Sequence, residues 1–295
     1  MNKLITIPTS PNFVTSEFNL LRAVGATSSP FSGKQRTQEF DLVAWEGTAT
    51  LPPMNRETAV NWQSFLLECV GTKNHFHFID PDAKTPQGTY DQDYLVGDVR
   101  LATNNASRTL SFTTDSKITS TSAVFANLVA GDFVTISGAD KPENNGTFKI
   151  TTFTSSTDIT VDASFIAESG TANCTVSQNI KGSEALSLAA KNNTGTGTIK
   201  KGDYLAIYDG AAETSNRIQL VMATADATET AQSGSPNHYS VAIQPKLRSD
   251  LTDTHIVGFK ATHNQSRFRL AENEVTWNAD RVSLYGITVA FTEVI

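Results

Sequence analysis

Cysteine and long apolar runs are both scarce in this sequence. Its 295 residues contain two cysteines, Cys69 and Cys174, which lie far apart in different sequence surroundings. We therefore predict neither a disulfide framework nor a cysteine-based metal site. No stretch approaches the ~18 apolar residues of a membrane-spanning helix, and the first residues lack the apolar core of a secretory signal. We expect no membrane insertion.

Charge is scarce as well, and the basic residues do not cluster. Charged side chains make up 18% of the chain, and the formal net charge is −7. A nucleic-acid-binding surface needs a cluster of Lys and Arg that displaces counterions from phosphates. The sequence offers only short basic pairs such as Lys200-Lys201. We expect no specific binding of nucleic acid.

The motifs of common enzyme classes are missing. The sequence contains neither a Gly-X-Ser-X-Gly nucleophile elbow nor a Walker phosphate loop. Two acidic pairs, Asp80/Asp82 and Asp91/Asp93, lie in turn-like sequence, where aspartate is favoured because it makes local hydrogen bonds. We interpret these pairs as turn residues. The prediction is a non-enzymatic protein without catalytic residues and without a cofactor.

Two histidines deserve a separate test as metal ligands. His75 and His77 stand two residues apart in an alternating segment, and such residues on a strand face the same side. Two ligands do not close a tetrahedral zinc site, and no third histidine lies nearby. We interpret the segment as a strand whose residues Phe76 and Phe78 fill a core. We predict no metal site.

What the sequence does contain favours β-structure. Threonine, serine, alanine and asparagine replace the missing charge, and β-branched or small polar side chains fit a pleated surface. The 16 Phe, 6 Tyr and 3 Trp are spread along the chain, which argues against disorder. We predict a mainly β protein of β-sandwich or β-barrel domains, with one amphipathic helix packed on a sheet. The length suits two or three domains.

The first hundred residues predict strands followed by the helix. Apolar and polar residues alternate in 36–45 and again in 48–51, with the turn signal Glu46-Gly47 between them, so we predict two strands joined by a bend. A helix is predicted over residues 56–70, capped by Asn55 and ended by Gly71 in the left-handed conformation. Apolar residues at three- and four-residue spacing give this helix one apolar face. The residues expected to pack it on the sheet are Ala59, Trp62, Phe65, Leu66 and Cys69.

The composition of the sequence changes between residues 103 and 178. Short alternating segments are separated by Ser, Thr, Asn and Gly. Asn144-Asn145-Gly146 predicts a hairpin with a type I′ turn, because that turn needs positive φ at both central residues. We predict that 103–178 is a small β-barrel or sandwich inserted into a core of residues 1–102 and 179–295, the second part being a C-terminal β domain.

A short Gly-Asp motif of this module recurs in the chain that follows it. Residues 130–136 (AGDFVTI) are similar to residues 201–207 (KGDYLAI). Turns that lead into strands select Gly and Asp strongly. We therefore interpret the recurring Gly-Asp motif as convergent turn chemistry in preference to an internal repeat.

Several segments together resemble the distal tail proteins of long-tailed bacteriophages (siphophages). The likeness covers roughly residues 1–102 and 180–295, and the first block is the more specific. The module at 103–178 departs from the plain family pattern and looks like a small β module found inserted in various virion proteins. The matching segments are 29–33 (SPFSG), 38–45, 45–54 (WEGTATLPPM), 56–59 with 62–66 and Gly71, 76–81 (FHFIDP), 243–248 (IQPKLR), 268–270 (FRL) and 291–293 (FTE).

The resemblance implies a virion protein, made in the host cytoplasm, that forms a ring, usually of six copies, at the tail tip. Its α+β N-terminal region would form an inner belt continuous with the tail-tube protein. Outer domains would carry tail-tip hub, fibre or receptor-binding proteins. The residues expected at the interface between copies are Phe40, Leu42, Trp45, Thr48, Thr50, Leu51 and Arg56.

Three other functions compete with this one. Within the structural class, the chain would be a tail-tube or tube-terminator subunit. As a binding module, it would hold glycans through exposed aromatics of the inserted domain, such as Phe125 or Phe165. As a cell-wall hydrolase, it would use Asp80 or Asp91.

Overall fold

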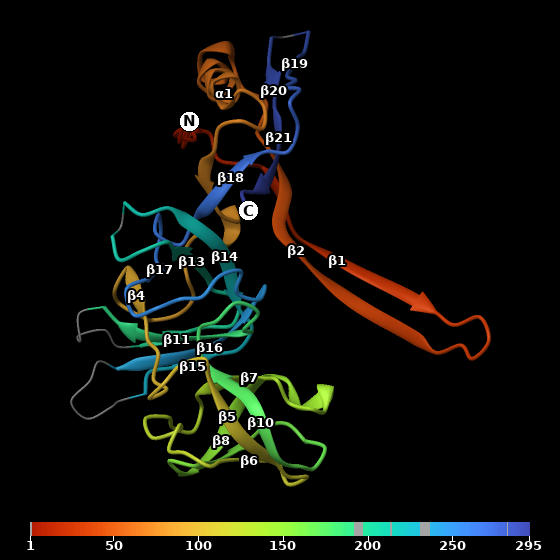
Figure 1. The fold of residues 1–295 in the computed structure, drawn as a ribbon. Coiled ribbons are helices and arrows are strands. Elements are labelled where there is room, and N and C mark those ends of the chain that lie inside the picture. Colours follow the sequence, from red (N-terminus) through yellow and green to blue (C-terminus); the bar gives the residue numbers. More distant parts are fainter. Residues whose placement is uncertain (1, 192–196, 213, 231–236, 282) are drawn as a thin grey trace. The chain divides into compact units, whose positions relative to one another are not determined.

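The computed structural model describes residues 2–191, 197–212, 214–230, 237–281 and 283–295 (Figure 1). They fall into two compact units. Unit 1 joins the residues up to Lys84 with Gln265–Ile295, and unit 2 is Thr85–Asn264. The described residues are mainly β with a single α-helix, which confirms the fold class predicted from composition and alternation.

The unit boundaries differ from the domain limits expected from the sequence. The stretches 85–102 and 179–264, which we expected in one core with residues 1–84, belong to unit 2. The reason is strand pairing. Strand β4 (Tyr94–Gly97) pairs with β11 (Ala185–Ala190) and with β17 (Ile256–Gly258), so these segments close a barrel of their own.

Unit 1 is built around a five-stranded antiparallel sheet with the strand order β1-β2-β21-β18-β3. Its two edge strands are therefore β1 and β3. A short ribbon of β19 (Asn278–Ala279) and β20 (Tyr285–Gly286) and one turn of 3-10 helix, η1 (Pro81–Ala83), complete the unit. The strands of the sheet are β1 (Thr15–Ser28), β2 (Gln35–Thr50), β3 (Phe76–Phe78), β18 (Ser266–Leu270) and β21 (Thr288–Glu293).

The helix α1 (Arg56–Cys69) begins where the sequence predicts. The Asn55 side chain accepts a hydrogen bond from the Thr58 amide at 3.0 Å, which satisfies one of the free donors of the first turn. At the other end Val70 already has φ 51°, so the left-handed turn begins one residue before Gly71 (φ 63°). The five residues that α1 buries are the five expected to pack on the sheet: Ala59, Trp62, Phe65, Leu66 and Cys69.

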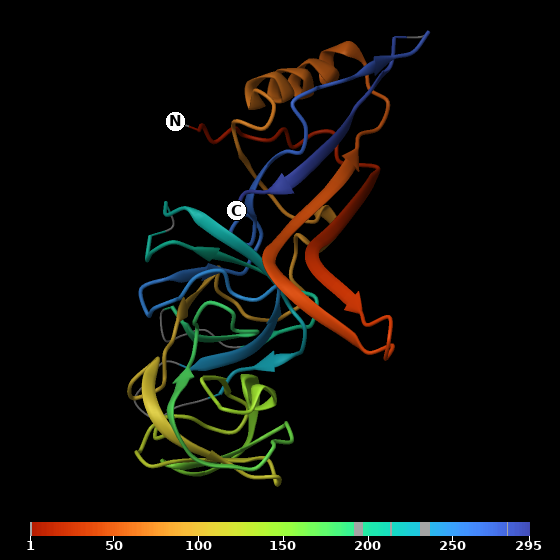
Figure 2. The ribbon, with the colours of Figure 1, turned by 45° about the vertical axis from the view of Figure 1, so that its right-hand side comes forward.

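The break predicted at Glu46-Gly47 between two strands is wrong, because β2 runs unbroken from residue 35 to 50. Gly47 pairs with Phe18 of β1 and with Phe291 of β21. A Cβ atom on Gly47 would lie 2.0 Å from the backbone oxygen of Glu17. The glycine therefore permits a close approach of backbones and forms no turn. The ribbon does bend (Figure 2), and its pairing register shifts between Arg22 and Val24 of β1.

Unit 2 contains two closed antiparallel barrels of six strands each. The first has the order β10-β5-β6-β9-β8-β7, and the second has the order β11-β16-β14-β13-β17-β4. A short ribbon of β12 (Thr198–Ile199) and β15 (Ala227–Thr228) accompanies them. The remaining strands are β5 (Ala106–Phe112), β6 (Lys117–Ser120), β7 (Phe133–Ser137), β8 (Gly146–Ser155), β9 (Asp158–Val161), β10 (Glu168–Ser177), β13 (Tyr204–Tyr208), β14 (Arg217–Ala223) and β16 (His238–Gln244).

The two barrels share one topology. When the strands of each barrel are numbered from one to six along the chain, both close in the circular order 1-2-5-4-3-6. All of the first barrel lies in the chain between β4 and β11, which are the first and second strands of the second barrel. The unit is thus one barrel inserted into another of the same topology.

The Gly-Asp motif lies at the same place in both barrels, directly before the third strand. Gly131 and Gly202 have φ values of 100° and 95°. The Gly131 amide donates to the Ile150 oxygen, and the amide of Ile150 donates to the oxygen of Asp132. Gly202, Ala223 and Asp203 make the equivalent pair of bonds. Shared topology and shared hydrogen bonding make the two barrels a structural repeat, which favours an internal repeat over the convergent turn chemistry that we expected.

The type I′ hairpin predicted at Asn144-Asn145-Gly146 is also wrong. Pro142–Asn144 form one turn of 3-10 helix, and Asn145 has φ −92°, which a type I′ turn excludes. The Asn145 side chain instead accepts from the Ala139 amide (2.9 Å) and donates to the Ala139 oxygen (3.2 Å). Asparagine thus closes this loop through its side chain and not through its backbone.

Candidate assembly surface of unit 1

The ribbon of β1 and β2 extends away from the rest of unit 1 as an arm (Figures 1 and 2). We define the arm as residues 21–42. The pairing of β2 with β21 covers only Glu46–Thr50, so the outer part of the ribbon, 24–28 with 35–39, pairs only with itself in the described structure. Every residue from 31 to 40 is exposed. A two-stranded ribbon in water is at best marginally stable by itself.

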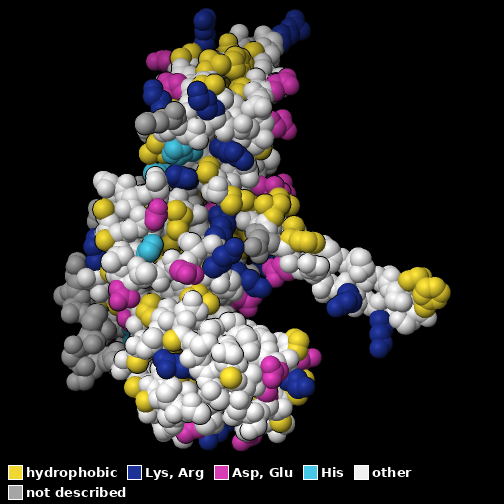
Figure 3. All heavy atoms as spheres, viewed as in Figure 1, with side chains coloured by type: hydrophobic (Ala, Val, Ile, Leu, Met, Phe, Trp, Pro, Cys, Tyr) yellow, Lys and Arg dark blue, Asp and Glu magenta, His cyan; other side chains and the backbone are white. Residues whose placement is uncertain are grey.

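The arm leaves its large apolar side chains 44–99% exposed in the described part of the chain. Hydrophobic atoms gather at its tip (Figure 3). Phe31 at the tip is 99% exposed. Contiguous exposed apolar side chains in a folded protein mark interaction surfaces. The exposed apolar residues of the arm are Leu21, Val24, Phe31, Phe40 and Leu42.

The base of the ribbon, in contrast, is anchored in the core of unit 1. Phe18 stacks on Trp45 with ring centroids 5.3 Å apart and also contacts Phe78, Phe268 and Phe291. Aromatic clusters of this kind bury large areas and hold their strands firmly. The arm is therefore a free ribbon held at one rigid end.

The residues expected at the interface divide into two groups. Phe40, Leu42, Thr48 and Arg56 are exposed and Thr50 is partly exposed, so their side chains are accessible. Trp45 and Leu51 are 5% and 2% exposed. The expectation for these two is corrected, because both side chains pack inside their own unit.

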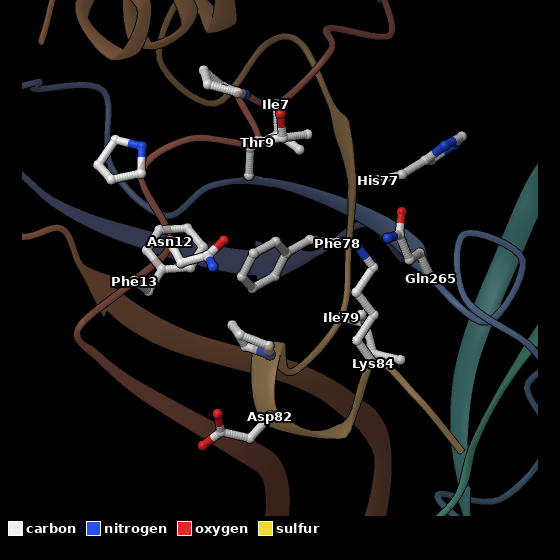
Figure 4. Close-up of a pocket in the computed structure, with 13 residues that line it drawn as sticks. Ile7, Thr9, Asn12, Phe13, His77, Phe78, Ile79, Asp82, Lys84 and Gln265 are labelled. Carbon is white, nitrogen blue, oxygen red and sulfur yellow. The ribbon is translucent and has the colours of Figure 1, made fainter. Parts of the chain in front are cut away.

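Unit 1 also contains an open pocket with a volume of about 520 Å³ (Figure 4). The rings of Phe13 and Phe78 meet edge to face in it, with centroids 5.9 Å apart. The exposed residues Thr9 and Asn12 lie at its mouth. Apolar and polar side chains both line the pocket: Ile7, Pro8, Thr9, Pro11, Asn12, Phe13, His77, Phe78, Ile79, Pro81, Asp82, Lys84 and Gln265.

The walls of this pocket are held by contacts with the helix and the sheet. The Trp62 indole donates to the Ser10 oxygen at 3.1 Å, and its ring contacts Phe13 at 5.4 Å. The amide of Ile5 donates to the His75 oxygen at 2.7 Å, which fastens the N-terminal segment beside β3. The pocket is therefore present before any partner binds.

The histidine pair lies beside this pocket. His77 lines it, and Phe76 and Phe78 are buried, as the strand interpretation requires. Partial burial and the nearby Arg267 guanidinium lower the pKa of His75. Among the described residues, no group of three or more His, Cys, Asp or Glu side chains is placed to hold a metal ion.

The two acidic pairs differ in their contacts, which are local for Asp80 and Asp82 and long-range for Asp93. The Asp80 carboxylate accepts from the Asp82 amide at 3.2 Å at the start of η1, and burial raises the pKa of Asp80. In unit 2, the Asp93 carboxylate lies 3.8 Å from His263 Nδ1. The backbone oxygen of Asp93 accepts from the Phe259 amide.

Two further expectations concern buried side chains. Phe125 and Phe165 are 0% and 5% exposed, so the idea that they hold a glycan is wrong. They belong to the core of the first barrel. Cys69 and Cys174 are both buried and unpaired, and burial raises the pKa of the Cys69 thiol to about 12.

Sequence reasoning missed one polar site, which lies between the two barrels of unit 2. The buried carboxylate of Asp132 accepts from Arg100 Nη1 (3.1 Å), from His238 Nε2 (3.0 Å) and from the Ser240 hydroxyl (2.7 Å). It also accepts from the Val129 amide at 2.9 Å. Burial alone raises the pKa of Asp132, but these hydrogen bonds outweigh it and hold the pKa below its ordinary value. The recurring Gly-Asp motif was the only sequence signal for this site.

No protein-family model and no curated protein matches the sequence. In the described part of the chain, the single α-helix is too short to cross a membrane.

Proposed function

We propose that this chain is a structural, non-enzymatic virion protein that forms a ring at the distal end of a phage tail. In this role it connects the tail-tube protein to tail-tip hub, fibre or receptor-binding proteins and lets DNA pass. The number of copies proposed is six, as in the family that the sequence resembles. The observation that carries the proposal is the arm, whose large apolar side chains are 44–99% exposed in the described part of the chain.

The arm leaves a strand edge and an apolar surface uncovered in the described part of the chain. An unpaired edge strand and an apolar ribbon are aggregation hazards for a lone protein. Contact with sister copies removes both hazards, and a head-to-tail contact that closes on itself gives a ring. The net charge of −7 suits the same role, because a DNA conduit should repel phosphate.

Assembly of the purified protein tests this proposal. We expect light scattering to show a concentration-dependent oligomer and negative-stain images to show rings. An arm-shortened variant replaces residues 25–38 by Asn-Gly, which joins the paired residues Val24 and Glu39 through a two-residue turn. This variant should stay monomeric while it keeps the tryptophan fluorescence of folded unit 1.

A matched control removes apolar surface elsewhere. Ile166 in the first barrel is 44% exposed, and Ile166→Ala should assemble like the wild type. A wild-type protein that remains a monomer at high concentration would refute the proposal. Stacks of many rings would instead identify a tail-tube subunit.

A further inference from the structure

We infer that the pocket of unit 1 lined by Phe13 and Phe78 binds a neutral pyranose, the ring form of a simple sugar. The pocket has a volume of about 520 Å³ (Figure 4). Small-molecule sites in proteins typically measure roughly 300–1,000 Å³. The inference goes beyond the proposed ring and does not depend on it.

Polar side chains with unused hydrogen-bonding groups line this pocket. In the described part of the chain, the side chains of Thr9, Asn12 and Gln265 make no hydrogen bond. Figure 4 shows Asn12 and Gln265 on either side of the Phe78 ring. An amide side chain both donates and accepts hydrogen bonds, and so does a hydroxyl. Sugar hydroxyls also do both, so they match this mixed set of donors and acceptors.

The charges on the pocket wall cancel. The lining contains one carboxylate, from Asp82, and one ammonium group, from Lys84, and it has no net charge when histidine is counted as neutral. An anionic ligand would be repelled by Asp82 and a cationic ligand by Lys84, so the wall favours neither sign. A carboxylate accepts hydrogen bonds from hydroxyls and an ammonium group donates to them. A neutral ligand with several hydroxyls therefore uses both groups.

The apolar surface of the pocket suits one face of a small ring. Phe78 and Ile79 are 6% and 3% exposed, so the apolar surface that a ligand meets comes from Phe13, one further isoleucine and three prolines. The Phe13 ring is held by edge contacts with Trp62 and Phe78. A pyranose packs the C–H groups of one face on such a ring and keeps its hydroxyls for the polar wall. An entirely apolar ligand would leave the polar wall without partners, which costs binding energy.

Saturation-transfer NMR on the full chain tests the inference. The probes are the methyl pyranosides of glucose, galactose and mannose, and at least one should bind with a dissociation constant on the order of 1 mM. Methyl glucuronide adds a carboxylate, and cyclohexanol keeps a ring with a single hydroxyl; both should bind at least about tenfold more weakly. Absence of binding by all three pyranosides, or equal binding of either control ligand, would overturn the inference.

Disaccharides separate the two sources of such a sugar. Maltose, lactose and mannobiose end in the same three sugars. Binding of the matching disaccharide would identify the end of a glycan chain as a ligand, and its exclusion would restrict the pocket to free sugar. Either result supports a pyranose site.

Two variants locate the binding. Asn12→Ala and Gln265→Ala each remove hydrogen-bonding groups from the pocket and should weaken binding roughly fivefold to tenfold. Asn61→Ala removes the same amide from the exposed side of α1 and should bind like the wild type. Unchanged tryptophan fluorescence shows that each variant keeps unit 1 folded. If neither pocket variant weakens binding, the sugar binds elsewhere and the inference is wrong.

The sugar test and the assembly test fail separately. Rings formed by a protein that binds none of the sugars would refute the pyranose site and leave the proposed ring intact. Sugar binding by a chain that stays monomeric, lost in Asn12→Ala and kept in Asn61→Ala, would support the site and refute the ring.

Discussion

The buried cluster around Asp132 gives the sharpest prediction for unit 2. Asp132→Asn keeps the shape of the side chain and removes its charge, which takes away the carboxylate that accepts a hydrogen bond from the buried Arg100 guanidinium. Removal of one partner of a buried ion pair costs about 3–5 kcal/mol of unfolding free energy. For a urea m-value of about 2–3 kcal/mol/M, the midpoint should fall by about 1–2.5 M.

The distribution of aromatic residues allows the two units to be followed separately. The three tryptophans, Trp45, Trp62 and Trp277, all lie in unit 1. Five of the six tyrosines lie in unit 2: Tyr90, Tyr94, Tyr204, Tyr208 and Tyr239. The variant should therefore shift the urea transition seen in the tyrosine signal of near-UV circular dichroism. The transition seen by tryptophan fluorescence should stay in place.

The repeat supplies a matched control at Asp203. Its carboxylate accepts from the amides of Gln87 (2.7 Å), Gly88 (3.0 Å) and Lys200 (2.8 Å), with no cation among these partners. Asp203→Asn should lower the midpoint less than Asp132→Asn does. If both variants lose the same stability, the charge on Asp132 is not what stabilises the cluster.

Acid supplies a further check on Asp132. Its pKa in the folded state lies below the ordinary value of 3.8, so its stabilising contribution is complete above pH 3.8 and is lost as the pH falls through the folded pKa. The stability difference between wild type and Asp132→Asn should therefore shrink below about pH 4. A difference that stays constant down to pH 2 would contradict the assignment.

Three smaller predictions concern unit 1. Gly47→Ala should destabilise it by several kcal/mol and broaden its tryptophan transition, because the added carbon would strike the Glu17 backbone, whereas Gly286→Ala, with open space around it, should be nearly neutral. Asn55→Ala should lower stability by about 1 kcal/mol through loss of the helix cap, measured by urea titration. The Cys69 thiol, with its pKa raised to about 12, should be inert to a disulfide reagent at pH 8 until the protein is unfolded; fast reaction of the native protein would count against the burial.

The elements that the sequence predicts well are those whose signal is local and periodic. The buried face of α1 follows from apolar spacing, and its start follows from the Asn55 cap. The short strand β3 follows from simple alternation. In each case the residues that carry the signal also make the contacts, so the sequence needs no knowledge of distant segments.

Gly47 shows where a local signal is ambiguous. A glycine after a glutamate indicates a turn, but here it marks a site where the backbones of two strands approach closely. The two cases differ only in which segments come to lie beside the glycine. Burial of Trp45 and Leu51 escaped prediction for the same reason, since alternation does not say which face of a strand meets another part of the chain.

The repeat escaped prediction because its two copies do not follow one another in the chain. The first barrel is inserted between the first two strands of the second, so a comparison of successive segments finds no constant period. Only the Gly-Asp turn keeps its residues, because only there do positive φ and a buried carboxylate act together. Elsewhere any apolar residue of suitable size preserves the core.

The Asp132 cluster follows from this insertion. Two chain crossings, 98–105 and 178–184, connect the inserted barrel to its host, and they carry both Arg100 and Gln178. Gln178 accepts from the Arg100 amide at 2.9 Å and donates to the Phe133 oxygen at 2.9 Å. The turn aspartate of the host barrel accepts from the backbone amides of Gln87, Gly88 and Lys200. The aspartate of the inserted barrel also binds His238 and Ser240 of the host. A turn residue that closes one barrel thus also fastens that barrel to the next, and a buried hydrogen-bonded network between them favours a single arrangement of the two barrels.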